Sequence, residues 1–175
     1  MSWQANTDNM CRNGYARIWM LRRLRRLGAS RTDMLDVYYK QIRCVLEMAV
    51  VVWTPGLTKS ESVQIERVQK CALHVILGDK YETYDQATKT LSVEKLHERR
   101  QKLSLTFAKK CEKNDKYATW FKLSEAIKDP NINTRGAVNR NQTKYIPVPF
   151  RTERYEKSPI PFLTKLLNEY YSVTK

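Results

Sequence analysis

The residues in this sequence with the clearest potential for chemistry are arginines near its N-terminus. Seven arginines occur between Asp8 and Asp33, and no acidic residue lies among them. They are Arg12, Arg17, Arg22, Arg23, Arg25, Arg26 and Arg31. Because a guanidinium group makes planar, bidentate contacts with phosphate, an arginine-rich face without acids suits a polyanion such as a nucleic-acid backbone. The alternative is an ordinary solvated charged face, which most basic helices carry.

The composition of the whole chain agrees with a polyanionic partner. Its 175 residues include 32 lysines and arginines but only 18 acids, so the formal net charge is +14. Such a charge is typical of proteins that contact nucleic acid or an anionic membrane surface. A second basic stripe is expected on a helix near residues 99–113. The predicted nucleic-acid-binding residues are Arg17, Arg22, Arg23, Arg25, Arg26, Arg99, Lys102, Lys109 and Lys110.

No arrangement of residues in the sequence predicts catalysis. The chain lacks an adjacent acidic pair of the kind that holds two magnesium ions, a glycine-rich phosphate loop and a nucleophile elbow. His74 and His97 fall on predicted polar helix faces, where a surface role is expected. The four cysteines are far apart and form no C-x-x-C pair, so neither a metal site nor a cofactor is expected, and their thiols should stay reduced. We therefore expect a binding protein that is not an enzyme by itself.

The sequence also bears on the compartment. The first fifteen residues are polar and do not resemble a signal peptide. The longest apolar run, Val45–Trp53, contains Glu47 and is too short to span a bilayer. The prediction is an intracellular protein, in the nucleus or cytoplasm or both, that is not secreted and has no membrane or small-molecule partner. Binding to a membrane surface ranks third, after nucleic-acid binding and protein binding, because the apolar helix faces are better suited to pack against one another than to contact lipid.

The arginine-rich stretch is expected to lie on a helix over about residues 7–27. Asn6 or Thr7 would be its N-cap, and Gly28 would end it in a left-handed conformation. In its first half, Cys11, Tyr15 and Ile18 share one apolar face. In its second half the apolar and basic positions alternate, so that one side is buried and the other exposed. The apolar side is Met20, Leu21, Leu24 and Leu27, and the basic side is Arg22, Arg23, Arg25 and Arg26.

Two further helices complete the predicted centre of the bundle. Ser30 opens a helix that runs continuously to Trp53, where its apolar end, residues 48–53, is expected in the core. Pro55-Gly56 then stops it. Thr58 and Glu61 form a capping box for a third helix, which ends near Leu77.

The remaining helices are expected to be a short one near residues 83–90 and a long one over about 93–113, which Ser92 would cap. Its predicted inward residues are Val93, Leu96, Leu103, Phe107 and Cys111. Arg100 also falls on this face, and its burial would require a carboxylate partner unless that turn is exposed. Four aromatic residues lie near the basic stripes and are expected more often to pack than to stack on bases: Trp19, Tyr39, Tyr81 and Tyr84.

The C-terminal part differs in character. Residues 126–157 are polar and basic, with prolines but no sustained periodicity, and predict an extended arm. Ser158-Pro159 begins a terminal helix whose apolar stripe, from Ile160 to Tyr170, should dock on another element. The predicted fold class is therefore all-α. It comprises a bundle of about five helices over residues 1–125, the basic arm over 126–157 and a terminal helix over 158–175.

Three stretches together resemble a known family. They are residues 17–78, 91–111 and 151–171. Their motifs are L-x-R-L-x-x-x-G at 21–28, V-L-E at 45–47 followed by V-W-x-P-G-L-T at 52–58, and I-E-x-V-Q-K-x-A-L-x-x-I-L-G at 65–78. In order and spacing they resemble the C-terminal thumb and tail of reverse transcriptases from non-LTR retrotransposons of the jockey-like group.

The resemblance implies a helical thumb that grips a primer–template duplex through its phosphate backbone. It also implies that the arginine-rich end of the first helix contacts that backbone, and that Trp53, Pro55, Gly56 and Leu57 are structural. Relatives carry fingers and a palm with a metal-binding aspartate pair, and this sequence has no counterpart of either. It is expected to begin just past the palm, and any polymerase activity would belong to a longer relative. In relatives a break precedes the tryptophan, where this chain has Val50-Val51-Val52.

The function expected from these observations is therefore a duplex-binding thumb fragment of a retroelement RNA-directed DNA polymerase that lacks the catalytic palm. Its partner would be an RNA or DNA duplex, and a palm domain or another protein is a further possible partner. The alternative is a protein-interaction module that docks through the Ile160–Tyr170 helix and the apolar Val50–Trp53 end. A retrotransposon-derived relic without function is the remaining interpretation.

Overall fold

The computed structural model describes residues 3–123 and 144–173, and within these residues every regular element is a helix. The all-α prediction is therefore confirmed. The chain forms two compact units, Met1–Gln101 and Lys102–Lys175. The boundary between them lies inside a helix and differs from the boundary expected near residue 125. Most of the predicted arm, residues 126–143, lies outside the described residues.

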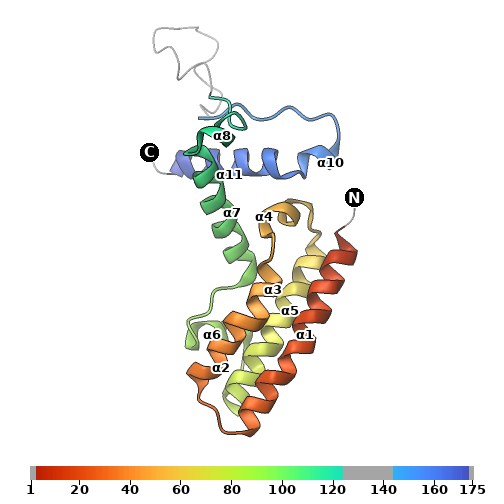
Figure 1. Cartoon of the computed structure of the whole chain (residues 1–175), viewed down its shortest axis with the longest axis vertical. Helices are drawn as coiled ribbons and strands as arrows, with labels where there is room; N and C mark the ends of the chain where they lie inside the picture. Colours follow the sequence, from red (N-terminus) through yellow and green to blue (C-terminus); the bar gives the residue numbers. More distant parts are fainter. Residues whose placement is uncertain (1–2, 124–143, 174–175) are drawn as a thin grey trace. The chain divides into compact units, whose positions relative to one another are not determined.

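Helix α1 (Gln4–Arg26) packs lengthwise against α5 (Lys59–Leu77) in the first unit (Figure 1). A Cβ atom on Gly14 would lie 2.8 Å from Cγ1 of Val68, so glycine permits the close approach of the two helices. The expected N-cap at Asn6 or Thr7 is wrong, because the helix begins earlier, after Trp3, without a capping side chain. Gly28 follows the helix with φ +76°, as predicted.

The second predicted helix is not continuous. It is divided into α2 (Arg31–Val37), the π-helical segment η1 (Tyr38–Arg43), α3 (Cys44–Glu47) and α4 (Val50–Trp53). Between α3 and α4 the chain breaks at Ala49, which has φ 51° and ψ 32°. Met48 and Val52 are 66% and 48% exposed, so the expectation of a wholly buried end is wrong. The indole nitrogen of Trp53 donates a hydrogen bond to the Met48 carbonyl at 2.7 Å, and this bond stabilises the turn around Ala49.

Local capping signals place the next elements where the sequence predicted them. Ser30 caps α2 through the Asp33 amide. Thr58 and Glu61 form the expected capping box of α5. The turn after α4 is η2 (Thr54–Gly56), and η3 (Gly78–Lys80) follows α5. Thr83 caps α6 (Tyr84–Thr90).

Helix α7 (Leu96–Glu112) starts later than expected. Ser92 has φ 52° and lies in the preceding turn, so its predicted capping role is wrong. The buried face also differs from the prediction, since Phe107 is 41% exposed and Leu103 only half-buried. The buried positions at helical spacing are Leu96, Arg100, Ser104, Ala108 and Cys111.

Arg100 is buried without the carboxylate that its position was expected to require. Its side chain is 3% exposed, and Nη2 donates a hydrogen bond to Oγ of Ser62 at 2.6 Å. Among the described residues, no carboxylate lies within ion-pair distance of it, and its Nη1 has no hydrogen-bond partner. Desolvation by burial lowers the pKa of this guanidinium.

A buried hydrogen-bond network specifies how α5 contacts its neighbours in the first unit. The Tyr38 hydroxyl donates to Oε1 of Gln69 at 2.5 Å, and both side chains are completely buried. Gln69 donates in turn to the Tyr84 hydroxyl at 2.8 Å and to the Glu94 carbonyl at 2.9 Å. Tyr84 donates to Glu66 at 2.5 Å. The network thereby connects η1, α5, α6 and the residues before α7.

The second unit contains the end of α7, α8 (Asp115–Ala118), α10 (Glu153–Glu156) and α11 (Pro159–Val173). The single turn α10 forms within the region predicted to be extended. Leu163 and Leu167 of α11 are completely buried, and Asn168 and Tyr171 of this helix hydrogen-bond with Tyr145 and Glu112 of the same unit. Glu112 accepts hydrogen bonds from Lys144, Tyr145 and Tyr171. Burial alone would raise the pKa of Glu112, but these donors outweigh it and lower the pKa.

Candidate nucleic-acid interface

The outer face of α1 carries the strongest concentration of unpaired positive charge predicted from the sequence. Arg22, Arg23 and Arg26 are all exposed. Within the described part of the chain, none of the three makes an ion pair or a side-chain hydrogen bond. Leu21, three residues after the buried Ile18, is completely covered on the opposite face, whereas the prediction that Leu27 lies on the same buried side is wrong, because Leu27 is 75% exposed. The alternation of apolar and basic positions therefore holds the guanidinium groups outward, as predicted.

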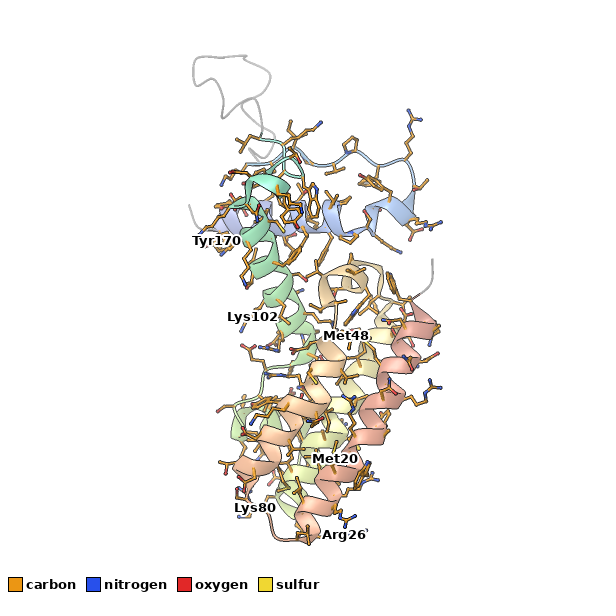
Figure 2. The ribbon with its side chains drawn as sticks, in the orientation of Figure 1. Met20, Arg26, Met48, Lys80, Lys102 and Tyr170 are labelled. Carbon is orange, nitrogen blue, oxygen red and sulfur yellow. The ribbon has the colours of Figure 1, made fainter. Side chains whose placement is uncertain are left out.

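These arginines continue a longer stripe that runs along α1. At 100° per residue, positions 12, 15, 19, 22, 23 and 26 lie within one arc of about 100°. We name this surface the α1 stripe; it consists of Arg12, Tyr15, Trp19, Arg22, Arg23 and Arg26. All six residues are exposed. Figure 2 shows Arg26 and Lys80 at the same end of the first unit, where α1 and α5 both finish.

Two aromatic side chains on the stripe are functional candidates: Trp19, which the sequence placed near the basic residues, and Tyr15, which it placed on the apolar face. Tyr15 is 45% and Trp19 is 55% exposed, so the expectation that Tyr15 faces inward is wrong. Desolvation by burial raises the pKa of Tyr15. Electrostatic interactions with Cys71 and Cys11 raise this pKa further, and the charge of Arg67 opposes the increase. The positive charge of Arg67, on α5, therefore acts at the Tyr15 hydroxyl. The spacing of residues 15, 19, 22 and 26 on one helical face is the signal that identifies the stripe from the sequence.

Arg25 serves the fold as well as the surface. Its Nη1 donates a hydrogen bond to the Val75 carbonyl at 3.2 Å, and its Nη2 lies 3.7 Å from Asp79. A Cβ atom on Gly78 would lie 1.8 Å from the same Nη2 atom, so the guanidinium rests on the glycine backbone. Arg25 therefore fastens the end of α1 to the end of α5, with its side chain still 40% exposed.

Arg17 has a structural partner in the interrupted helix. Its Nη1 donates a hydrogen bond to the Gln41 carbonyl at 2.7 Å. Gln41 lies within η1, where the backbone hydrogen bonds differ from those of an α-helix and leave carbonyls in need of other donors. The position of Arg17 is thus explained by the packing of α1 on η1, and it stands apart from the α1 stripe.

Arg99, predicted for the second basic stripe, is held by acids. Its side chain pairs with Glu47 and lies 3.7 Å from Glu94. Arg43 shares Glu47 at 3.6 Å. Burial alone would lower the pKa of Arg99. The hydrogen bond to Glu47 and the charge of that carboxylate outweigh the burial, so the pKa of Arg99 is raised. A guanidinium held in this way has less capacity left for phosphate.

The lysines predicted for the second stripe belong to the second unit. Lys102 and Lys110 are exposed on α7. Lys109 is half-buried, and its ammonium lies 3.3 Å from the ring centroid of Tyr170, a cation–π contact. The predicted site residues therefore divide between the two units.

The other aromatic residues near the predicted stripes mostly pack within the fold, as expected. Tyr39 lies under the guanidinium of Arg43 at 4.1 Å. Tyr81 meets the His74 ring edge-on, with centroids 4.8 Å apart. Tyr84 belongs to the buried network. Trp19 is the exception, because in the described residues it has neither a ring contact nor a hydrogen bond.

Comparisons with known proteins do not identify the chain. It matches no family model, and neither a curated protein nor a solved structure resembles it significantly. Across residues 3–123 and 144–173, no helix is both long and apolar enough to cross a bilayer. The same residues contain no group of three or more histidine, cysteine or acidic side chains placed to hold a metal ion.

Proposed function

We propose that the chain binds nucleic-acid duplex through the phosphate backbone, with the arginine-rich end of the α1 stripe as its contact surface. The observation that carries the proposal is the exposure of Arg22, Arg23 and Arg26 without any acidic partner in the described residues. Guanidinium groups that are not neutralised within the protein attract phosphate and displace its condensed counterions.

The architecture supports a backbone contact that does not read sequence. The basic residues at the end of the stripe, Arg22, Arg23 and Arg26, are exposed on the outer face of one helix, from which their side chains can turn toward phosphates. Contacts of this kind position a duplex without distinguishing base pairs. We therefore expect similar affinities for duplexes of different sequence.

The biological setting that we propose is the thumb of a retroelement RNA-directed DNA polymerase. The motifs at residues 21–28, 52–58 and 65–78 support it, together with an all-α structure that exposes the arginines of the first motif. In this setting the chain holds the primer–template duplex and supplies no catalytic group. The metal-binding aspartates would belong to a palm, to which the thumb is joined in such polymerases.

A salt titration tests the proposed binding. Affinity for a blunt duplex should fall steeply with salt, with a slope of about −0.9 per phosphate contact in a plot of log K against log salt concentration. The variant with Arg22, Arg23 and Arg26 all replaced by alanine should bind more weakly, and its slope should be shallower by about three units.

A matched control separates a specific surface from net charge. Lys40, Lys59 and Lys89 are exposed on η1, α5 and α6, and their replacement by alanine removes the same total charge. The control variant should keep nearly the wild-type affinity and slope. Equal losses in the two triple variants, or binding that does not respond to salt, would contradict the proposal.

A protein-interaction function is a second candidate because Met48 and Val52 are exposed around the break at Ala49. Two apolar side chains on one short turn offer a small docking surface, and a palm domain is the partner that the motifs suggest. The apolar stripe of α11 no longer supports this candidate, since Leu163 and Leu167 are completely buried and offer no surface to a partner. Nuclease-resistant binding to a palm fragment that Val52→Glu abolishes would favour it.

A further inference from the structure

The two aromatic residues of the α1 stripe are only partly covered by the fold. Trp19 is 55% exposed, and within the described chain its indole has no partner. Tyr15 is 45% exposed one helical turn earlier. A tryptophan has a large apolar surface, and its burial is favourable. Phosphate contacts made by the neighbouring arginines do not explain why a tryptophan is exposed on this face. The pair therefore indicates a ligand that offers flat apolar faces.

Duplex alone does not supply such faces, because its bases are stacked inside the helix. An unpaired nucleotide does, since every base can stack on an aromatic ring irrespective of sequence. Tyr15 and Trp19 are four residues apart, which places their backbone positions about 6 Å apart along the helix axis. That separation exceeds the rise of about 3.4 Å per nucleotide in a duplex strand and suits an extended single strand.

The charge around the aromatic pair is also positive. Arg12 precedes Tyr15 on the stripe, and the charge of the exposed Arg67 of α5 acts at the Tyr15 hydroxyl. The nearest acid on this side of α1 is Asp8, about 10 Å from Tyr15 along the axis. Asp8 is already hydrogen-bonded by Gln4 at 2.8 Å. Phosphates of a strand passing over the rings would therefore meet the positive charge of Arg12 and Arg67.

We infer that the α1 stripe binds a junction between duplex and single-stranded nucleic acid. The arginines at positions 22, 23 and 26 contact duplex phosphates, and unpaired bases stack on Trp19 and Tyr15, with Arg12 and Arg67 beside the strand. This inference rests on the proposed function, because it assigns a more specific ligand to the same surface.

Binding of the full chain to two probes tests the inference. One probe is a blunt duplex, and the other is the same duplex with an oligothymidine extension. The wild type should prefer the extended probe. Because stacking on an aromatic ring contributes substantially per base, Trp19→Ala should weaken binding to the extended probe by about tenfold or more and leave the blunt duplex unchanged. Trp19→Phe, which keeps an aromatic face, should retain most of the preference.

Two controls make the result specific. Val63→Ala removes a side chain that is 50% exposed on α5, elsewhere in the first unit, and should change neither affinity. Indole emission gives an independent measurement, because the difference between wild-type and Trp19→Phe spectra isolates Trp19. That difference signal should be quenched by the extended probe and not by the blunt duplex.

The possible failures are distinguishable. If the wild type binds both probes equally, or if Trp19→Ala weakens both by the same factor, the junction inference is wrong and the duplex proposal stands. If the wild type binds neither probe, the proposed function fails, and the inference fails with it.

Discussion

Removal of the Tyr38 hydroxyl should destabilise the first unit without changing its shape. This side chain is completely buried, and its hydroxyl donates to Oε1 of Gln69 at 2.5 Å. Tyr38→Phe keeps the ring and deletes the donor. The Gln69 oxygen would then be a buried acceptor without a partner, while its amide nitrogen stays bound to Tyr84 and to the Glu94 carbonyl.

The expected cost follows from this geometry. An ordinary hydrogen bond contributes about 1 kcal/mol net, but a buried polar atom left without its partner costs about 1–3 kcal/mol. No water can readily replace the hydroxyl, because both side chains have no exposed surface. We therefore expect the free energy of unfolding to fall by about 2 kcal/mol. The loss corresponds to a decrease of roughly thirtyfold in the folded-to-unfolded ratio.

Urea denaturation followed by tryptophan fluorescence measures the effect. Three of the four tryptophans, Trp3, Trp19 and Trp53, lie in the first unit. The midpoint should move to lower urea concentration with an unchanged slope, because the surface exposed on unfolding stays the same.

Tyr39→Phe is the matched control for this prediction. Tyr39 is the neighbouring residue, is only half-buried, and stacks under Arg43 through its ring, which phenylalanine preserves. Its replacement should change stability by less than about 0.5 kcal/mol. If Tyr38→Phe is as mild as Tyr39→Phe, the buried network does not stabilise the unit in the way inferred here.

Two further predictions concern the backbone and pH. Ala49→Gly should stabilise the chain by about 0.5–1 kcal/mol, because an L-residue is strained at φ 51° and glycine is not. The control Ala16→Gly, at an exposed position inside α1, should instead destabilise the chain, because glycine has low helix propensity. Comparison of both variants by urea denaturation checks this, and a loss of stability in each would refute the strain at Ala49. Burial holds the pKa of Tyr38 above its ordinary value, so the unfolded chain releases the proton first and the free energy of unfolding should fall as the pH rises above about 10. The fall should be shallower in Tyr38→Phe, and denaturation curves at several alkaline pH values that show equal falls would contradict it.

The elements predicted correctly are those that depend on neighbours in the sequence. Thr58 and Glu61 cap α5 because the two residues that satisfy each other's backbone amides are three positions apart. Gly28 adopts a positive φ because α1 ends where its apolar spacing stops. The outward position of Arg22 and Arg23 follows in the same way from the alternation with Leu21.

The predictions that failed depend on contacts between distant residues. The helix expected to run from Ser30 to Trp53 breaks at Ala49, a residue with good helix propensity, and contains a π-helical segment whose Gln41 carbonyl is satisfied by Arg17 from another helix. No signal within the segment marks either feature. Arg100 was expected to need a carboxylate, but the side chain within reach after folding is Ser62.

For the candidate site, the sequence by itself determined which residues carry charge and that Arg22, Arg23 and Arg26 face outward, because both depend only on composition and helical periodicity. It placed Tyr15 and Leu27 wrongly, since both are exposed. Tertiary structure decided which of those charges remain available. In the folded protein Arg17 donates a hydrogen bond to the Gln41 carbonyl, Arg25 contacts the end of α5, and Arg99 lies between two acids. Tertiary structure also left Trp19 exposed, with no hydrogen bond or ring contact to the rest of the described residues, since the exposure of a helical residue depends on what packs beside the helix.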